Sequence, residues 1–178
     1  MIKLHNRVSD SNISKAELVE NIEITKISYQ DYNRIVEILS NCFDLSPNEV
    51  TAQFLFSQVD LCNSVKAIDK RSGEIYGVLI FCNYNITVGT PILHTNPLLG
   101  KLLQPFKQIN GHSFVLDERL RGLGIDKKML EYNAEYINQH KFIWCAVENS
   151  LKSHNYWKRL GFVEVLSNTE AKFYIKSL

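Results

Sequence analysis

Residues 119–124 read RLRGLG and place two arginines and two glycines within six positions. They follow an apolar run, HSFVL at 112–116, and precede a segment whose apolar residues recur at helical spacing. A strand, a glycine-rich turn and a helix form a general anion-binding arrangement, because the first amides of a helix lack partners and lie at the positive end of its dipole. Glycine lets the backbone come close to an anion, and arginine suits phosphate because its planar fork offers several donors. We therefore predict an anion-binding turn.

Two common phosphate-binding loops do not fit this spacing. A Walker A loop needs the run G-x-x-x-x-G-K-[ST], which the sequence does not contain. A dinucleotide-binding fingerprint needs a third glycine three residues after Gly124, where Lys127 stands instead. A bare G-x-G is weak evidence, and Gly122 and Gly124 are equally compatible with a tight strand-to-helix turn that binds nothing.

The composition limits the class of protein. The chain has 178 residues, of which 45% are hydrophobic and 22% charged, as in ordinary soluble globular proteins. Its formal net charge of +1 argues against a nucleic-acid binder, which would concentrate Lys and Arg. No apolar stretch approaches the roughly 20 residues that span a bilayer, and the N-terminus resembles no secretory signal. We therefore expect a cytoplasmic protein that binds neither nucleic acid nor membrane.

The four cysteines, Cys42, Cys62, Cys82 and Cys145, lie 20 or more residues apart. No pair has the close spacing of a zinc site, and no pair of histidines supplies one. Because free cysteine tends to be buried, we expect buried free thiols and no metal site.

Periodicity and turn residues predict the elements that position the glycine turn. Strands are expected at 21–28, on both sides of the turn KRSGE at 70–74, and at 112–116, 141–147, 162–166 and 171–178. Helices are expected at 30–43, 46–56, 125–137 and 149–160, with Asn149 as an N-cap and Gly161 as a stop. This order predicts a mixed sheet with helices packed on it. We expect one domain over 21–178, preceded by a loose extension over 1–20.

Two further features narrow the interpretation of the turn. The segment FVLDERLRGLGIDKKML resembles motif A of the GNAT N-acetyltransferase superfamily, [QR]-x-x-G-x-[GA], with Arg119, Gly122 and Gly124 at the three defined positions. The segment VENSLKSHNYWKRLGF resembles the family's next segment, an Asn, a helix that carries a Tyr, and Leu-Gly-Phe. Asn149 and Tyr156 fall on the first two of those positions. Together the motifs cover residues 112–165.

The resemblance implies a fold and a co-substrate. The fold is an α/β (mixed α+β) arrangement, with a central mixed, mostly antiparallel sheet flanked by helices on both faces. The co-substrate is acetyl-CoA, with its pyrophosphate on the amides of residues 121–126 and its pantetheine between the strand before the turn and the strand ending at Val147. The residues expected to bind it are Val115, Leu116, Arg119, Arg121, Gly122, Leu123, Gly124, Ile125, Asp126 and Asn149.

The resemblance also implies direct attack of an amine on the thioester. Tyr156 matches the tyrosine that protonates the departing thiolate. His112 is our candidate for the base, because an unperturbed histidine pKa near ~6.5 suits proton transfer at neutral pH. A structural histidine at the start of the strand is an equal alternative, and Glu118 and His154 are weaker candidates for the base.

Three departures from the family pattern bear on function. Asp126 and Lys152 stand where small residues are usual, and a carboxylate at 126 repels a neighbouring phosphate unless it points away. Residues 86–111 separate two strands that a short turn usually joins. This insert is either a lid or wall over the acceptor site, or an excursion packed on the sheet.

We therefore expect an acetyl-CoA-dependent N-acetyltransferase that acts on a primary amine of a small molecule or peptide. A non-catalytic CoA-binding or CoA-sensing module with the same fold is the alternative. A transferase of longer acyl groups, accommodated by the apolar 86–111 segment, is a third interpretation. The sequence leaves a homodimer open.

Overall fold

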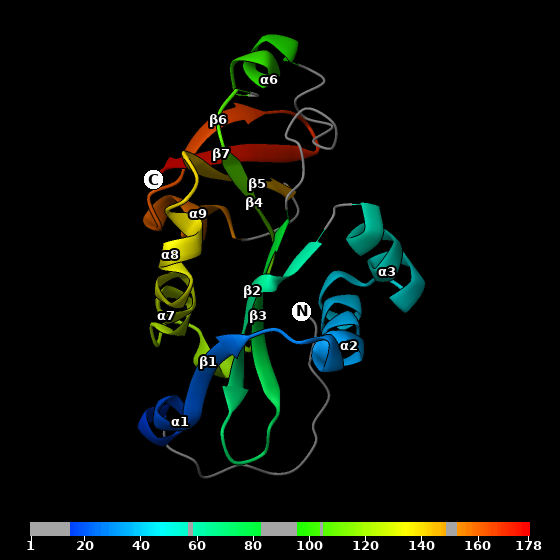
Figure 1. The fold of residues 1–178 in the computed structure, drawn as a ribbon, viewed down its shortest axis with the longest axis vertical. Helices are drawn as coiled ribbons and strands as arrows, with labels where there is room; N and C mark the ends of the chain where they lie inside the picture. Colours follow the sequence, from blue (N-terminus) through cyan, green and yellow to red (C-terminus); the bar gives the residue numbers. More distant parts are fainter. Residues whose placement is uncertain (1–14, 57–58, 83–95, 104, 149–152) are drawn as a thin grey trace. The chain divides into compact units, whose positions relative to one another are not determined.

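Among the residues that the structure describes, seven strands form one mixed sheet in the computed structural model, in the order β1-β2-β3-β4-β5-β7-β6 (Figure 1). They are β1 (Ile22–Lys26), β2 (Val59–Asp69), β3 (Ile75–Cys82), β4 (Gln108–Leu116), β5 (Phe142–Glu148), β6 (Val163–Ser167) and β7 (Ala171–Ser177). β4 and β5 pair in parallel, whereas the pairs β1–β2, β5–β7 and β6–β7 are antiparallel. The mixed sheet predicted from the order of elements is confirmed.

The structure describes residues 15–56, 59–82, 96–103, 105–148 and 153–178. Its helices are α1 (Lys15–Asn21), α2 (Tyr32–Phe43), α3 (Pro47–Phe56), α6 (Pro97–Leu103), α7 (Ile125–Tyr132), α8 (Ala134–Ile137) and α9 (His154–Arg159), with 3₁₀ turns η1 (Tyr29–Asp31) and η2 (Glu118–Leu120). The chain divides into two compact units, which we describe separately. Unit 1 comprises residues 1–56, 60–80 and 113–133, and unit 2 comprises 57–59, 81–112 and 134–178.

In unit 1, two lysines show that helices cover both faces of the strands. Lys66 of β2 forms an ion pair of 2.6 Å with Asp31, immediately before α2. Lys26 of β1 donates to the side chain of Asn133, which caps the end of α7. Because Lys66 is paired with Thr25, the neighbour of Lys26, the two lysines point to opposite faces. α2 and α7 therefore lie on opposite faces of these strands.

Asn133 also explains why the helix predicted over 125–137 is divided into α7 and α8. Its side chain is 2% exposed and donates to the backbone carbonyl of Asn63, in addition to accepting from Lys26. Asn133 has φ of −104° and ψ of 13°, outside the helical range, so α7 ends at a residue whose side chain is held by β1 and β2. The apolar periodicity carries no sign of this long-range bond.

In unit 2, the core is built from Phe142 and Trp144 of β5 and Phe173 of β7, with ring centroids of Trp144 and Phe173 5.4 Å apart. Leu99 and Leu103 of α6 pack against this cluster. The part of the 86–111 insert that forms α6 is therefore an excursion packed on the sheet, one of the two predicted alternatives. Residues 86–95 of the insert lie outside the described residues. β4 begins at Gln108, within the predicted insert, because residues 108–110 pair with β5.

Other expectations have mixed outcomes. α1 occupies part of the predicted extension, and its Leu18 is 9% exposed; the boundary at residue 20 stays a prediction. Cys82 and Cys145 are buried thiols, but Cys62 is exposed and Cys42 half-buried.

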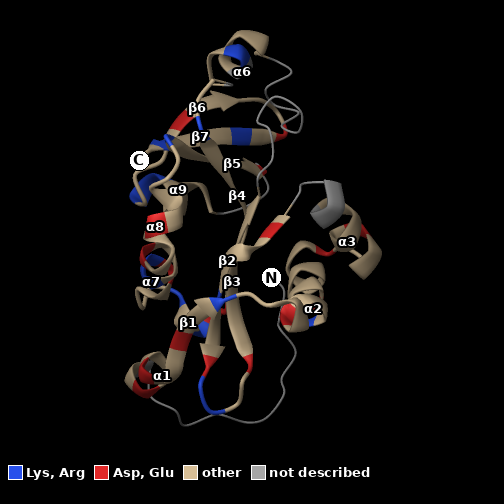
Figure 2. Cartoon of the chain, viewed as in Figure 1, with Lys and Arg blue, Asp and Glu red and all other residues tan. Residues whose placement is uncertain are grey.

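Among the described residues there is no cluster of three metal-ligating side chains and no helix long and apolar enough to cross a membrane. Figure 2 shows acidic and basic residues spread along both units.

Candidate functional site

The RLRGLG turn is built as the sequence predicts. Gly122 and Gly124 adopt φ values of +75° and +77°, in the left-handed region that other residues rarely occupy. A Cβ added at either position would meet nothing within 4 Å, so these glycines are required by backbone conformation and not by packing within the protein. Gly124 is the N-cap of α7 and has no side chain to accept from the first-turn amides. The first amides of α7 therefore receive no side-chain cap from the N-cap residue.

Arg119 is held by an acidic neighbour. Its Nε and Nη2 donate to the two carboxylate oxygens of Asp117 at 3.0 and 3.1 Å, and its backbone N–H donates to Asp117 Oδ1 at 2.9 Å. The hydrogen bonds to Asp117 raise the pKa of Arg119. The guanidinium also lies 4.8 Å from the ring centroid of Tyr76. Arg119 thus shapes the η2 turn and shares its charge with a buried carboxylate.

Arg121 has a different environment. Its Nε donates to the backbone carbonyl of Leu116 at 3.1 Å, which ties the arginine back to the end of β4. Burial raises the pKa of the Cys42 thiol, and the positive charge of Arg121 partly offsets this effect. The end of α2 therefore lies within electrostatic reach of the turn. Arg121 is exposed and has no carboxylate partner among the described residues of its unit.

β4 approaches β3 closely just before the turn. Val115 and Leu116 are buried, at 6% and 8% exposure. A Cβ at Gly77 of β3 would lie 2.7 Å from Leu116 Cδ1 and 3.1 Å from the Val115 carbonyl oxygen. Asp117 N–H continues the contact by donating to the Tyr76 carbonyl at 2.8 Å. Sequence reasoning missed Gly77, although a glycine inside an apolar strand is itself a sign of close backbone approach.

The other residues predicted to bind the donor lie in the turn and in the first turn of α7, and they differ in burial. Ile125 is fully buried, whereas Leu123 is half-buried. Asp126 is half-buried in the first turn of α7, where its charge is favourable to the helix dipole. Unit 1 therefore brings together all the predicted donor-binding residues from Val115 to Asp126. Asn149 and Lys152 lie outside the described residues.

The two residues predicted to transfer protons belong to unit 2. His112 is half-buried on β4, and burial lowers its pKa to about 4. Its imidazole is therefore uncharged at neutral pH, but it is a weaker base than an unperturbed histidine. Tyr156 is half-buried on α9, with its ring in an edge-on contact with Trp157 at 5.3 Å between centroids.

The weaker candidates for the base have other environments. His154 Nδ1 lies 3.0 Å from the hydroxyl of Tyr174, which is fully buried on β7. Glu118 is exposed in η2. Gly161 ends α9 with φ of +85°, as predicted. Sequence reasoning placed His154 correctly on the helix that carries Tyr156 but had no means of finding Tyr174.

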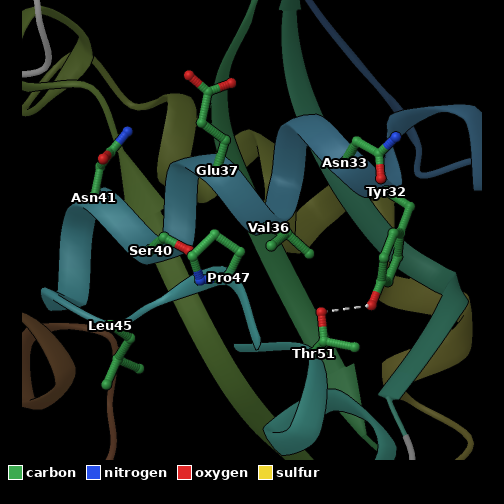
Figure 3. A pocket seen from close by; sticks show the side chains of 9 residues that line it. All are labelled: Tyr32, Asn33, Val36, Glu37, Ser40, Asn41, Leu45, Pro47 and Thr51. Atoms are coloured by element: carbon green, nitrogen blue, oxygen red, sulfur yellow. Dashed lines mark hydrogen bonds between the residues drawn. The ribbon is translucent and has the colours of Figure 1, made fainter. Parts of the chain in front are cut away.

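An open pocket of about 400 Å³ lies between α2 and α3 in unit 1 (Figure 3). Tyr32 donates to Thr51 Oγ1 at 3.2 Å on one side of it. Glu37, on the α2 side, pairs with Arg34 at 2.8 Å. The pocket is lined by Tyr32, Asn33, Val36, Glu37, Ser40, Asn41, Leu45, Pro47 and Thr51. None of the predicted site residues contributes to it, because it arises from how two helices pack.

Comparison by sequence finds no relative of this chain. No protein-family model matches it, and no curated protein is similar to it. In the sequence, the resemblance to the GNAT superfamily therefore rests on the two motifs alone.

Comparison by structure gives a different result. Ard1 from Thermoplasma volcanium superposes with a TM-score of 0.62 at 12% identity, over 89% of this chain and 98% of that one. NAA60 of Arabidopsis thaliana, solved with a bisubstrate analogue, gives 0.64 at 14% identity, over 88% and 99%. Polyamine N-acetyltransferase of Drosophila melanogaster gives 0.64 at 13% identity, over 88% and 100%.

In this chain the glycine turn lies between β4 and α7, which is the strand-to-helix connection that the sequence predicts for it. At such low identities the likeness concerns the fold. The chain has the fold of the GNAT N-acetyltransferase superfamily.

Proposed function

We propose that this protein is an acetyl-CoA-dependent N-acetyltransferase that transfers an acetyl group to a primary amine of a small molecule or peptide. The observation that supports it most is the turn before α7, in which two glycines with positive φ expose the start of a helix in a GNAT fold. The first amides of α7 lie at the positive end of the helix dipole and receive no side-chain cap from Gly124, which suits them to an anion such as a pyrophosphate.

The donor's pyrophosphate is proposed to bind the amides of residues 121–126. Of the two arginines, Arg121 is the better phosphate ligand, because Arg119 is already engaged by Asp117. The backbone groups of Val115 and Leu116 are proposed to bind the pantetheine amides, with Asn149 as a further contact. A strand N–H near Leu116 polarises the thioester carbonyl.

The chemistry is proposed as direct transfer. The amine nitrogen forms a bond to the acetyl carbon, the carbon–sulfur bond breaks, and the electron pair leaves with sulfur. Tyr156 donates a proton to the thiolate, and His112 accepts the proton that the amine loses. The low pKa of His112 makes its protonated form a strong acid, so the proton passes on to water, and water returns a proton to the Tyr156 phenolate.

The acceptor is proposed to be an amine because the solved structures with this fold include a complex with a bisubstrate analogue and a polyamine acetyltransferase. Peptide N-termini, polyamines, amino acids and aminoglycosides are the classes to compare. Nothing in the described residues favours one of them, since the glycine turn concerns the donor alone.

A non-catalytic CoA-binding module is the second candidate. One observation favours it: burial depresses the pKa of the candidate base, His112. This module binds CoA but does not release it from acetyl-CoA in the presence of any amine.

Two measurements test the proposal and separate the candidates. CoA and acetyl-CoA should raise the melting temperature of the protein, since a ligand that binds only the native state stabilises it. Release of free thiol is then followed with each class of amine. No thermal shift at millimolar ligand overturns both candidates, whereas a shift without turnover on any amine supports the module.

A further inference from the structure

The short helix α6 of unit 2 is apolar on two of its faces. Leu99 and Leu103 pack against the aromatic core cluster of β5 and β7. Leu98 and Leu102, each one residue earlier, are 73% and 67% exposed. Because they are four residues apart, these two leucines are neighbours on the helix surface. No other large aliphatic side chain among the described residues is as exposed as this pair. The outer face of α6 therefore presents two adjacent leucines to solvent.

Phe106 extends this apolar surface beyond the end of the helix. Its backbone N–H donates to the Leu103 carbonyl at 3.1 Å, which holds Phe106 beside the last turn of α6. Its ring contacts Phe142 edge-on, with centroids 6.4 Å apart, and still remains 48% exposed. Single exposed apolar residues are ordinary, but several that lie together mark a surface on which something binds.

The charges of the segments that form this surface have one sign. Lys101 of α6 is exposed, and Figure 2 shows blue and no red on this helix. Lys107 and Lys141 are also exposed and lie side by side, because the N–H of Lys141 donates to the Lys107 carbonyl at 2.6 Å. Residues 75–116 contain no Asp or Glu, and neither do residues 136–147. The chain as a whole has a formal net charge of only +1, so this surface is basic by local arrangement.

Leucine and phenylalanine beside lysine are the residues of segments that lie in the headgroup region of a membrane. Protein–protein interfaces are instead enriched in Trp, Tyr and Arg and depleted in Lys. Sites for single-stranded nucleic acid stack bases on aromatic rings, which two leucines do not offer. A second copy of this chain would bring three lysines against three lysines, and such like-charge contacts are unfavourable. The chemistry of the surface therefore matches a lipid bilayer that carries negative charge.

We propose that α6 and the turn after it form a docking surface for a membrane that contains anionic lipids. Leu98, Leu102 and Phe106 enter the boundary between headgroups and acyl chains, and the three lysines contact the negatively charged headgroups. Whole-chain composition, from which we expect no membrane binding, averages over such a local surface. The inference goes beyond the proposed function, because it concerns where the protein acts and not what it transfers.

Co-sedimentation of the full chain with vesicles tests this surface. The vesicles consist of phosphatidylcholine alone or of phosphatidylcholine with phosphatidylserine. We expect binding to the phosphatidylserine vesicles at low salt, at least tenfold weaker binding to phosphatidylcholine alone, and loss of binding at high salt. Leu98→Ser combined with Leu102→Ser should weaken binding by about tenfold or more. Lys101→Gln combined with Lys107→Gln should weaken it by about tenfold, on the phosphatidylserine vesicles only.

Two matched controls come from unit 1. Tyr29→Ser removes a side chain that is 81% exposed, and Lys70→Gln combined with Lys127→Gln removes two exposed lysines. Neither control should change the binding to either kind of vesicle. Circular dichroism and thermal melting show whether each variant folds. Should the double leucine variant not fold, Leu98→Ser alone decides, because it changes the more exposed position and should still weaken binding about threefold.

Four results overturn the inference. The wild type does not bind phosphatidylserine vesicles, or a control weakens binding as much as the leucine variant does. The lysine variant weakens binding while the leucine variant does not, which leaves only a general attraction between charges. Sedimentation velocity without lipid shows self-association that the leucine variant abolishes, which assigns the surface to a second copy. None of these measurements involves CoA or an amine, so this inference and the proposed function can fail separately.

Discussion

The glycine turn of unit 1 and the proposed proton-transfer residues of unit 2 differ in the kind of chemical group that each would offer a ligand. In the turn, the groups proposed to face a ligand are backbone amides, and the side chains of Arg119 and Arg121 hydrogen-bond to Asp117 and to the end of β4. In unit 2, the proposed groups are side chains: the imidazole of His112, whose pKa is lowered by burial, and the phenol of Tyr156.

This difference predicts how each region responds to substitution. A backbone site is sensitive to conformation and insensitive to most changes of side-chain chemistry, whereas a side-chain site loses its function when one polar atom is removed. Binding and turnover should therefore be separable by region, and variants ordered by the size of their effect can test that separation.

The largest effect is expected at Tyr156. Tyr156→Phe keeps the ring and its contact with Trp157 but removes the proton donor, so kcat should fall by about two to three orders of magnitude. The Kd of CoA should not change. Tyr29→Phe, at an exposed tyrosine of unit 1, is the matched control. Thiol release under single-turnover conditions measures the effect, and an unchanged kcat removes Tyr156 from its proposed role.

The pH dependence of stability should report on His112. Its pKa is about 4 in the folded chain and near ~6.5 when unfolded, so the unfolded chain takes up the proton first as the pH falls. The free energy of unfolding is then unaffected above about pH 6.5 and decreases between about pH 6.5 and 4, by up to about 3 kcal/mol.

Denaturant unfolding of the wild type and of His112→Gln over this range checks the prediction. The variant should lose that part of the pH dependence. Parallel curves for the two proteins mean that other groups carry the effect and that His112 is not buried in its neutral form.

A smaller effect, confined to binding, is expected at Gly124. Gly124→Ala and Gly73→Ala both place a Cβ at positive φ in open space, and each should cost about 1 kcal/mol of stability. Only Gly124→Ala should also weaken CoA binding, by about tenfold, because its methyl group meets the phosphate. Calorimetry measures the Kd. Equal affinities in the two variants argue that no anion approaches the turn.

The smallest effects should separate the two arginines. Arg121→Met should raise the Kd of CoA several-fold and reduce its dependence on salt, because a charge near the pyrophosphate is lost. Arg119→Met should leave the Kd almost unchanged and lower stability by at most about 1 kcal/mol, since the Asp117 pair is half-exposed on the arginine side. The reverse pattern contradicts the assignment of Arg121 as the phosphate ligand.

The features predictable from the sequence are those set by neighbouring residues. The positive φ of Gly122, Gly124 and Gly161 follows from turn chemistry and from helix ends. The start of α3 is equally local: Ser46 and Glu49 cap each other across Pro47, as a serine and a glutamate three residues apart predict.

The features that the sequence did not predict depend on residues far apart in the chain. The depressed pKa of His112 comes from burial, and burial is decided by packing. The predicted helix is divided at Asn133, whose side chain bonds to Asn63, 70 residues earlier, and the apolar periodicity carries no sign of such a contact. Asp117, the partner of Arg119, is only two residues away in the sequence. The position of this pair also depends on Tyr76 of β3, whose ring lies next to the Arg119 guanidinium and whose carbonyl accepts from Asp117 N–H.

One irregularity at the end of the sheet bears on how copies of this chain meet. β6 is a terminal strand, so one of its edges offers backbone donors and acceptors to any passing strand, and Val163 and Val165 are exposed on it at 64% and 41%. The register of β6 shifts between Glu164 and Leu166. Such a bulge bends and twists a strand, so a second flat strand can follow it over a short stretch only. The irregular edge therefore protects the chain against growth into extended intermolecular sheets.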